Sequence, residues 1–465
     1  METAVAQPPG GGRTGVGRGG LVTDLYELNM AAVYLRRGMT GPATFSLFVR
    51  KLPPGRGFLV AAGLADCLDF LERFGFAPED LAWLRDTLGL DGATIAALSR
   101  LRFSGDVWAV PEGRVVLAGE PLLEVTAPLA EAQLVETALL NQVTFQTAVA
   151  SKAARCRLAA GRAELVDFAF RRTQGLDAAM AVARATALAG FSGTSNVEAA
   201  RRYGLTAVGT MAHSFIEAFP DERAAFRAFA ERFPDRSVFL VDTYDTAGGV
   251  LAAIDVIAEL GLGGRLGVRL DSGDLGALAV TARRLLDRAG LSRARIFASG
   301  GLDEYAIAEL VARRAPIDAY GVGTKVGVSA DAPYLDSAYK LVAVDDRPVM
   351  KLSPGKVNPP GPKQVFRGAS GQDDVVGTRD ERPPGGREPL LVPVMLGGRR
   401  TGADGDLAAA RASLDRDLAW LPPAALRLDG PAPPGVRLSR RLESLRDRVQ
   451  AALGRQYPPG AGRPR

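Results

Sequence analysis

The sequence SVFLVD at residues 237–242 is a short apolar run that ends in a carboxylate, and RLGVRLD at 265–271 repeats this form. Four further runs share the pattern: AELVDFAF (163–170), LTAVGTM (205–211), ARIFAS (294–299) and IDAYGV (317–322). The segments between them have the spacing of amphipathic helices. Strands that alternate with helices in this way predict a parallel sheet covered by helices. We therefore expect an α/β fold that contains an irregular TIM-like α/β barrel.

The polar and glycine residues of this region fall where the predicted strands end. In a barrel the carboxyl ends of all strands converge on one face, which carries the active site, whereas an open doubly wound sheet spreads them along a crevice. Six consecutive units with this arrangement favour the barrel. The residues concerned are Arg171, Arg172, Thr210, His213, Asp242, Asp245, Asp271, Ser299, Gly300, Gly301, Gly323 and Thr324.

Outside the barrel the order of elements is mixed, which is typical of an α+β domain. We expect a disordered tail at 1–20, an N-terminal α+β domain at 21–135, the barrel at 136–340, a C-terminal segment at 341–454 that packs on the N-terminal domain, and a second disordered tail at 455–465. The expected elements are helices at 24–37, 61–74, 78–86 and 438–453, a strand at 43–50, and further strands within 101–126.

The composition excludes several classes of function. One histidine and two cysteines are too few for a zinc cluster or a disulfide framework. The net charge of +5 comes from arginines that are interleaved with acidic residues, as in TARRLLDR (281–288), so we expect no nucleic-acid partner. No apolar run approaches the length of a membrane span. We expect a soluble, cytoplasmic protein that does not bind membranes.

Three groups of residues suggest chemistry at the strand ends. His213 follows Thr210 closely in VGTMAHSF (208–215), which favours a functional histidine over one packed in the core. Asp242 and Asp271 could hold Mg²⁺ or sugar hydroxyls, while Asp274 is more typical of a helix cap. The glycine loops FASGG (297–301) and GVGT (321–324) are suited to a phosphate. Together they indicate a phosphorylated sugar, a divalent cation and one histidine.

In addition, the sequence resembles the nicotinate phosphoribosyltransferase family over about residues 22–368, through motifs in the same order. The motifs are TDLYELNM (23–30), FSLFVRKLPPGRGF (45–58), FAFRRTQG (168–175), FSGTSNV (191–197), GTMAHSF (209–215), LVDTYDT (240–246), VRLDSGDL (268–275), SGGLDE (299–304), GVGTK (321–325) and a lysine- and glycine-containing pattern at 339–367. Glu27 and Asn29 stand where the family usually has Gln and Thr.

The resemblance implies a type II phosphoribosyltransferase of NAD biosynthesis. Such an enzyme joins nicotinate to 5-phosphoribosyl-1-diphosphate, giving nicotinate mononucleotide and diphosphate, with ATP hydrolysis coupled through a phosphohistidine and a ligase-type classification. It also implies Mg²⁺, ATP as a co-substrate, and a homodimer with shared active sites.

The resemblance also implies a role for each site residue. His213 corresponds to the phosphorylated histidine. The nicotinate site comprises Thr210, Arg269, Ser195 and Tyr26, with Tyr26 supplied across the dimer interface. Ser195 stands where nicotinamide-using relatives carry Asp, whose charge would repel nicotinate. The phosphoribosyl diphosphate site comprises Arg171, Arg172, Asp271, Ser299, Gly300, Gly301, Gly323 and Thr324, and the magnesium ligands are Asp242 and Asp271.

Other functions remain open from the sequence. The same barrel could use nicotinamide or quinolinate. A phosphate-binding lyase or aldolase would need a Schiff-base lysine or general base, and only Lys152 and Lys325 lie near the predicted barrel. An arginine-rich nucleic-acid binder would bind DNA or RNA in a salt-sensitive manner. An inactive family member is a further alternative, although no motif residue is visibly broken.

Overall fold

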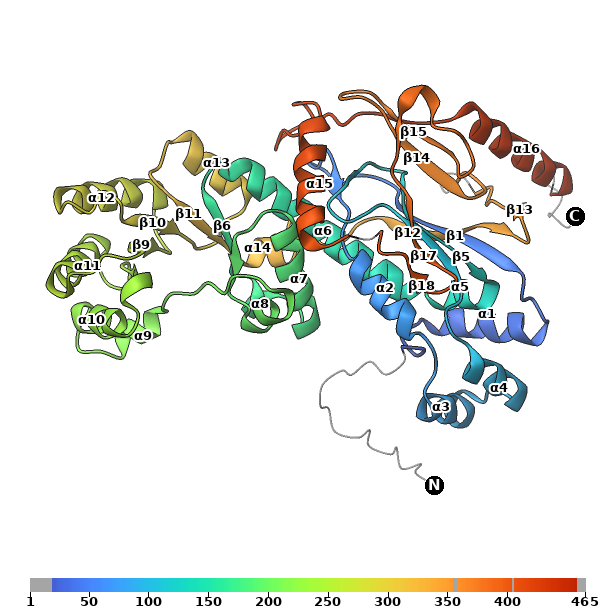
Figure 1. Ribbon diagram of the computed structural model, residues 1–465, viewed down its shortest axis with the longest axis horizontal. Helices are drawn as coiled ribbons and strands as arrows, with labels where there is room; N and C mark the ends of the chain where they lie inside the picture. The colour runs from blue at the N-terminus through green and yellow to red at the C-terminus, as the bar shows by residue number, and fades with distance from the viewer. Residues whose placement is uncertain (1–18, 354–357, 404, 458–465) are drawn as a thin grey trace, which may run out of the picture.

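The computed structural model describes residues 19–353, 358–403 and 405–457. The expected tails at 1–20 and 455–465 lie mostly outside this part of the chain. The molecule has two lobes, which meet along the long helix α6 (Glu136–Ala160) (Figure 1). Among the described helices, none combines the length and apolar character needed to cross a bilayer.

One lobe is built on a six-stranded sheet with the order β7-β6-β11-β10-β9-β8, in which every neighbouring pair is parallel. These strands are β6 (Glu164–Asp167), β7 (Gly193–Thr194), β8 (Val238–Leu240), β9 (Gly267–Leu270), β10 (Arg295–Ala298) and β11 (Ala319–Val322). The chain order runs around the sheet and returns from β11 to β6, as in a TIM barrel. The sheet is open between β7 and β8, so the expected irregular barrel is confirmed in the form of a half-barrel.

The predicted strand at 205–211 is wrong. Residues 206–208 make a single bridge to Thr194 through two backbone hydrogen bonds, and no strand forms. The segment lies at the opening of the half-barrel, where its other edge has no neighbouring strand, and much of it is therefore exposed. A short apolar run of this kind needs a partner on each side to persist as an inner strand.

Helices that follow the strands cover the half-barrel. Their bounds are α7 (Leu176–Leu188), α8 (Val197–Tyr203), α9 (His213–Glu217), α10 (Glu222–Arg232), α11 (Thr246–Leu260), α12 (Leu275–Arg288), α13 (Glu304–Ala312) and α14 (Thr324–Gly327). Asp245, Asp274 and Asp303 accept backbone N–H bonds as N-caps of α11, α12 and α13. The cap expected at Asp274 is therefore present, while Asp271 remains available for other contacts.

The other lobe centres on a seven-stranded sheet with the order β13-β12-β1-β5-β3-β17-β18. Its strands are β1 (Pro42–Val49), β3 (Asp106–Ala109), β5 (Pro121–Pro128), β12 (Ser337–Val344), β13 (Arg347–Pro348), β17 (Val392–Leu396) and β18 (Arg399–Arg400). Strands from both ends of the chain therefore share one sheet, which confirms that part of the C-terminal region packs on the N-terminal region. A helical layer comprises α1 (Leu25–Arg36), α2 (Leu64–Arg73), α3 (Pro78–Leu88), α4 (Gly92–Arg100) and α5 (Leu129–Leu134). Helix α4 was not predicted.

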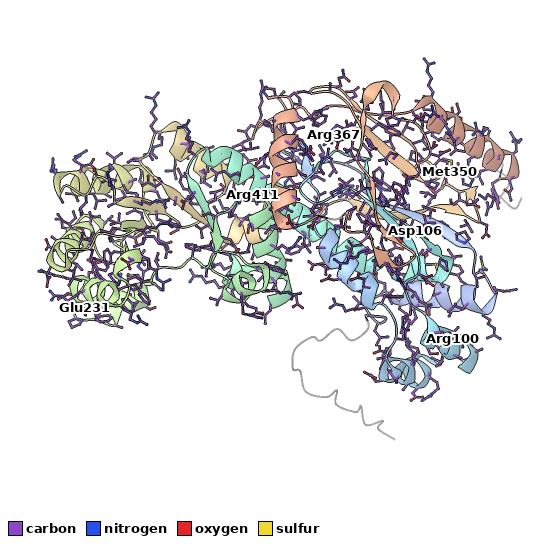
Figure 2. The ribbon with its side chains drawn as sticks, in the orientation of Figure 1. Arg100, Asp106, Glu231, Met350, Arg367 and Arg411 are labelled. Carbon is purple, nitrogen blue, oxygen red and sulfur yellow. The ribbon has the colours of Figure 1, made fainter. Side chains whose placement is uncertain are left out.

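Two smaller sheets and two further helices complete the fold of the described residues. A four-stranded sheet comprises β14 (Lys363–Arg367), β15 (Asp374–Thr378), β16 (Glu388–Pro389) and β19 (Val436–Leu438), while β2 (Leu59–Val60) pairs with β4 (Val115–Val116). Helix α15 (Leu407–Trp420) stands beside the junction of the lobes, where Arg411 donates a hydrogen bond to the Phe191 carbonyl (Figure 2). Helix α16 (Arg440–Gln456) lies on the surface, as its amphipathic sequence predicted.

Candidate active site at the carboxyl edge of the half-barrel

Arg269 is the centre of the candidate site. It lies in β9 between the buried residues Val268 and Leu270, so its side chain projects to the opposite face of the strand. The guanidinium donates to Ser299 Oγ at 2.8 Å and to Asp271 Oδ1 at 2.7 Å, and Nη1 donates to Thr210 Oγ1 at 3.2 Å. One arginine thus joins the residues after β9 and β10 to Thr210 in the segment before α9. The structure brings Arg269, Thr210, Asp271 and Ser299 together.

An aromatic ring lies beside this arginine. The guanidinium carbon of Arg269 is 5.4 Å from the centre of the Phe168 ring, within the range of a cation–π contact. Phe168 stacks on Phe297 of β10 with 5.6 Å between ring centres. Strand β6 ends at Asp167, three residues before the end of the predicted strand, so Phe168 stands at the carboxyl edge of the sheet.

The two candidate metal ligands are linked through the backbone. Asp242 Oδ2 accepts hydrogen bonds from the Asp271 backbone N–H at 2.9 Å and from the Ser272 hydroxyl at 2.7 Å. Its other oxygen, Oδ1, is buried and has no hydrogen-bond partner. Burial opposes ionisation of the Asp271 carboxyl, but the hydrogen bonds from Ser299 and Arg269 hold its pKa below the usual value. Asp271 is therefore a carboxylate at neutral pH.

These carboxylates suit Mg²⁺ better than zinc. The described residues contain no cluster of three or more His, Cys, Asp or Glu side chains arranged around a common metal position. Mg²⁺ usually keeps several waters and takes one or two protein carboxylates together with substrate phosphates. The unpartnered oxygen of Asp242 beside Asp271 fits that donor set.

His213 is the first residue of the short helix α9 and is half-buried. Its ring Nδ1 lies 3.1 Å from the hydroxyl of Thr243, which follows β8. The hydroxyl can accept the proton on Nδ1, which leaves the lone pair of the histidine on Nε2. The negative Asp271 lies close enough for His213 to contribute to its lowered pKa. His213 therefore belongs to the same site as Arg269.

The glycine loops follow β10 and β11. A Cβ atom at Gly300, whose φ is +93°, would lie 1.9 Å from the Asp271 carbonyl oxygen, so only glycine fits this turn. Gly301 has open space where a side chain would stand. Gly323 precedes the exposed Thr324, which begins α14. The Ser299 hydroxyl is buried and bonded to Asp271 and Arg269, so its side chain faces the arginine.

The remaining sequence-predicted residues lie at the margins. Arg171 and Arg172 form an exposed single turn after β6. Ser195 is half-buried, and its backbone N–H donates to the Asp167 carbonyl at 2.8 Å. Tyr26 is on α1 in the other lobe, away from the half-barrel strands that carry Arg269 (Figure 1). Within one chain, therefore, the structure does not bring Tyr26 to the rest of the site.

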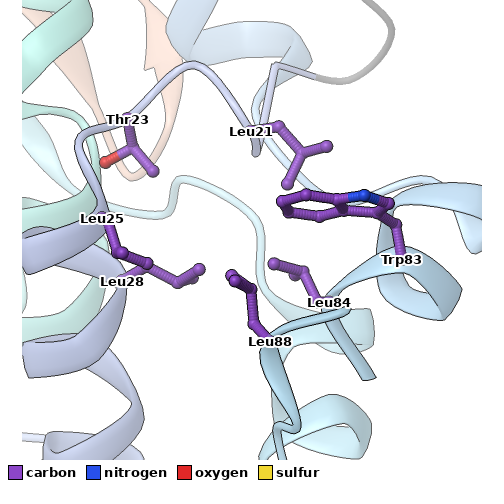
Figure 3. A pocket seen from close by; sticks show the side chains of 7 residues that line it. All are labelled: Leu21, Thr23, Leu25, Leu28, Trp83, Leu84 and Leu88. Atoms are coloured by element: carbon purple, nitrogen blue, oxygen red, sulfur yellow. The ribbon is translucent and has the colours of Figure 1, made fainter. Parts of the chain in front are cut away.

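The described cavities lie away from Arg269. A polar cavity of about 790 Å³ separates α2 and α6 from α7 and α8. An apolar cavity of about 420 Å³ lies beside α1, where Leu21, Leu25 and Leu28 face Trp83, Leu84 and Leu88 of α3 (Figure 3). Leu25 and Trp83 are each about half exposed. Helix α1 thus presents apolar surface next to Tyr26.

Two residues of the site were missed from the sequence. Phe168 was assigned to a strand, although its place after Asp167 in the motif FAFRR could have marked it as a strand-end residue. Thr243 lies in LVDTYDT between Asp242 and Asp245, whose carboxylates are the stronger signal for a ligand or a helix cap. Its contact with His213 joins residues 30 positions apart, and no local pattern predicts such a contact.

Two family models match the chain. The model described as the nicotinate phosphoribosyltransferase N-terminal domain matches residues 21–144, and the model of the nicotinate phosphoribosyltransferase family matches residues 163–354. The second match spans the half-barrel and the candidate site.

Curated and solved relatives agree with these matches. A nicotinate phosphoribosyltransferase of Mycobacterium tuberculosis (strain ATCC 25618 / H37Rv) is 52% identical over 386 residues, covering 82% of this chain and 83% of the relative. The nicotinate phosphoribosyltransferase of Bacillus subtilis (strain 168) is 46% identical, covering 75% and 72%. The crystal structure of human nicotinic acid phosphoribosyltransferase superposes with a TM-score of 0.83 at 32% identity, covering 92% of this chain and all of that one.

Proposed function

Since this chain belongs to the nicotinate phosphoribosyltransferase family, we propose that it joins nicotinate to 5-phosphoribosyl-1-diphosphate. The products are nicotinate mononucleotide and diphosphate, a step of NAD biosynthesis. The observation that carries the proposal is the position of Arg269. Its guanidinium reaches Thr210, Asp271 and Ser299 at the carboxyl edge of the half-barrel, where barrel enzymes place their chemistry.

The pyridine ring is held by charge and by an aromatic wall. Arg269 supplies a planar fork for the nicotinate carboxylate, with Thr210 as a neighbouring hydroxyl. Phe168 beside the guanidinium offers a face against which a pyridine can stack. Ser195 brings no negative charge to the pyridine site, which favours nicotinate over an amide substrate.

The phosphoribosyl donor is held on the other side of Arg269. Gly300, Gly301, Gly323 and Thr324 form loops in which backbone N–H groups can approach the 5-phosphate. The Asp271 carboxylate binds the ribose hydroxyls, and the exposed Arg171 and Arg172 face the diphosphate. As the pyridine nitrogen forms its bond to the anomeric carbon, the bond to diphosphate breaks, and these arginines stabilise the charge on the departing oxygens. Asp242 and Asp271 would hold Mg²⁺, which would neutralise diphosphate charge when bound.

ATP acts through His213. The lone pair on Nε2 attacks the γ-phosphorus of ATP, a nitrogen–phosphorus bond forms, and ADP departs with the electrons of the broken phosphorus–oxygen bond. Thr243 supports this role because its contact with Nδ1 orients the ring. Hydrolysis of the phosphohistidine after transfer returns the imidazole to its starting form. With this coupling the enzyme would be classified as a ligase.

A homodimer completes the site. Tyr26 is about half exposed on α1, next to exposed Leu25 and the apolar cavity of Figure 3. Leu176, Val197 and Tyr244 are exposed apolar residues at the carboxyl edge of the half-barrel. Apolar surface on both lobes favours an assembly in which α1 of one subunit covers the strand ends of the other. Tyr26 would then stack on nicotinate across the interface.

The function is tested by incubating the protein with the phosphoribosyl donor, Mg²⁺ and one pyridine, with and without ATP, and measuring the mononucleotide. Nicotinate, nicotinamide and quinolinate are compared in parallel. The proposal predicts the highest kcat/KM with nicotinate. Greater activity with either of the other pyridines would overturn the proposed substrate.

A further inference from the structure

The two glycine loops are joined by an ion pair to which the proposed function assigns no role. Lys325 of α14 follows Thr324 directly, and its Nζ lies 2.8 Å from Asp303 Oδ2. Asp303 is two residues beyond Gly301, and its other oxygen accepts the Ala306 N–H as the N-cap of α13. The pair therefore connects the loop after β10 to the loop after β11 beside the open space at Gly301.

Buried ion pairs also connect the segments that follow the two loops to helix α6. Glu304, which follows Asp303, is fully buried and accepts hydrogen bonds from Lys152 at 2.6 Å and Arg155 at 3.0 Å, both on α6. Lys152 also lies 2.8 Å from Asp331, which follows α14. The same lysine thus contacts the segments that follow both loops.

The network extends to the N-terminal lobe. Arg56, in the connection between β1 and β2, donates to both oxygens of Asp331 at 2.9 Å and to the Ser329 hydroxyl at 2.7 Å. Ser329 is buried and has a left-handed backbone with φ of +46°, a conformation that a non-glycine residue adopts only when its surroundings hold it there. The segment after the second loop is therefore fixed by an arginine from the other lobe.

These contacts form two groups. The buried pairs under the loops are called the base here, and the Lys325–Asp303 pair that joins the two loops is called the clamp. The base pairs, Lys152–Glu304 and Arg56–Asp331, bury their cationic side chains almost completely, whereas Lys325 keeps 43% of its side-chain surface exposed. Removing one partner from a buried pair leaves an unpaired buried charge and threatens folding. In the Lys325–Asp303 pair the lysine is partly exposed and Asp303 keeps its hydrogen bond from the Ala306 N–H, so this pair can be broken with less damage.

We propose that Lys325 and Asp303 are positioning residues that set the separation of the two glycine loops and so determine affinity for the 5-phosphate of the phosphoribosyl donor. This inference rests on the proposed function, because it takes those loops to be the phosphate cradle. A cradle of backbone N–H groups binds a phosphate well only when both loops are held at the right distance before binding. The clamp acts through loop geometry, and neither side chain needs to touch the donor.

The test compares Lys325→Gln, Asp303→Asn and the double variant with the wild-type protein. We expect each single variant to raise the KM for the donor about ten-fold, with little change in kcat or in the KM for nicotinate. The double variant should resemble the weaker single variant, since the clamp is already open after one change. Lys325→Arg keeps the charge and should restore most of the donor affinity. Asp303→Asn retains an oxygen for the α13 cap, so its effect reports the lost ion pair.

A matched control lies on the same sheet. Glu164 and Arg295 pair at 3.0 Å at the amino ends of β6 and β10, and the Arg295 side chain is 38% exposed, close to the 43% of Lys325. Glu164→Gln should leave the donor KM unchanged. If Lys325 instead binds the donor directly, Asp303→Asn should release the lysine and leave donor affinity unchanged or stronger. That result would overturn the clamp.

Donor binding is also measured by calorimetry with 5-phosphoribosyl-1-diphosphate and Mg²⁺ alone, without a pyridine. Weaker binding by both single variants supports the clamp even if the wild-type protein does not use nicotinate, and then the proposed function alone fails. Normal nicotinate turnover with unaltered donor binding in both variants rejects the clamp and leaves the function intact. Absence of donor binding by the wild-type protein contradicts the clamp as well, because the loops would not be a phosphate cradle.

Discussion

His213 Nδ1 lies 3.1 Å from the hydroxyl of Thr243, and this contact orients the only histidine of the chain. His213 begins α9, whereas Thr243 lies in the loop that follows β8. The contact turns Nε2 away from Thr243. Nε2 is the atom that we propose to accept the phosphate of ATP.

Replacing Thr243 with valine keeps the shape of the side chain but removes the hydroxyl. We expect Thr243→Val to lose most of the ATP stimulation, because Nδ1 no longer has its partner and the ring loses its fixed tautomer. Turnover without ATP should stay near the wild-type value. The measurement is the ratio of initial rates with and without ATP. Thr281→Val, on the exposed face of α12, is the matched control, and an unaltered ratio in Thr243→Val would show that this contact does not serve the histidine.

Arg269→Lys tests the planar fork at the centre of the site. A single ammonium cannot contact Ser299, Asp271 and Thr210 in the positions that the guanidinium reaches. We expect kcat/KM for nicotinate to fall about 100-fold, the scale of losing a desolvated, hydrogen-bonded charge contact. Arg313→Lys changes an exposed arginine paired with Asp274 and should have no effect. Activity above half of the wild-type value in Arg269→Lys would argue against a carboxylate-binding fork.

Ser195→Asp tests the choice of pyridine. A new carboxylate at this half-buried position should repel nicotinate and accept a hydrogen bond from nicotinamide, so the ratio of kcat/KM values should move about ten-fold or more towards nicotinamide. Ser292→Asp adds the same charge before β10, at the opposite edge of the sheet, and should leave the ratio unchanged. A ratio that does not move in Ser195→Asp would remove Ser195 from the specificity site.

The buried carboxyl of Glu120, which contacts the C-terminal segment at Asp374, makes stability depend on pH. Burial raises the pKa of Glu120 to about 8, and the neighbouring Asp374 carboxylate adds to the effect. Between the unfolded pKa and pH 8 the folded protein therefore holds a proton that the unfolded chain releases, so the free energy of unfolding falls as pH rises, by at most about 1.4 kcal/mol per pH unit from this group. Arg367, which is labelled in Figure 2, pairs with Asp374. Its positive charge opposes the rise in the pKa of Glu120.

Glu120→Gln removes this titration. Chemical denaturation at several pH values from 5 to about 9 should show a smaller decline for the variant than for the wild-type protein. Glu388→Gln, which alters an exposed carboxyl paired with Arg114 in the same region, controls for a general loss of charge. Parallel curves for Glu120→Gln and the wild-type protein would mean that Glu120 is not the group responsible.

Much of the fold could be predicted because the relevant signals are local. The apolar runs that became β6, β8, β9, β10 and β11 are each flanked by helical spacing and end near a polar residue. The run at 205–211 has the same local pattern but lies where the sheet is open, and the sequence carries no signal for a missing neighbour. Local pattern predicts a strand, whereas pairing decides whether the strand forms.

The site divides in a similar way. Arg269 and Asp271 are two residues apart, so a strand reading already puts them on one face. Their contacts with Thr210 and Ser299 depend on how the strand–helix units are arranged in space. The family motifs, and not the spacing of residues, placed these four residues in one site. The Thr243–His213 contact and the Lys325–Asp303 pair required the structure, because each joins side chains that are more than 20 residues apart in the sequence.

The most direct test is the rate at which the wild-type protein forms nicotinate mononucleotide from nicotinate and the phosphoribosyl donor with Mg²⁺. The rate is measured with and without ATP, and His213→Ala is assayed under the same conditions. We expect ATP to stimulate mononucleotide formation by the wild-type protein but not by His213→Ala, and we expect phosphate from ATP to be found on residue 213 of the wild-type protein. No mononucleotide from nicotinate under either condition would contradict the proposed function, and equal ATP stimulation of His213→Ala would contradict the role of the histidine.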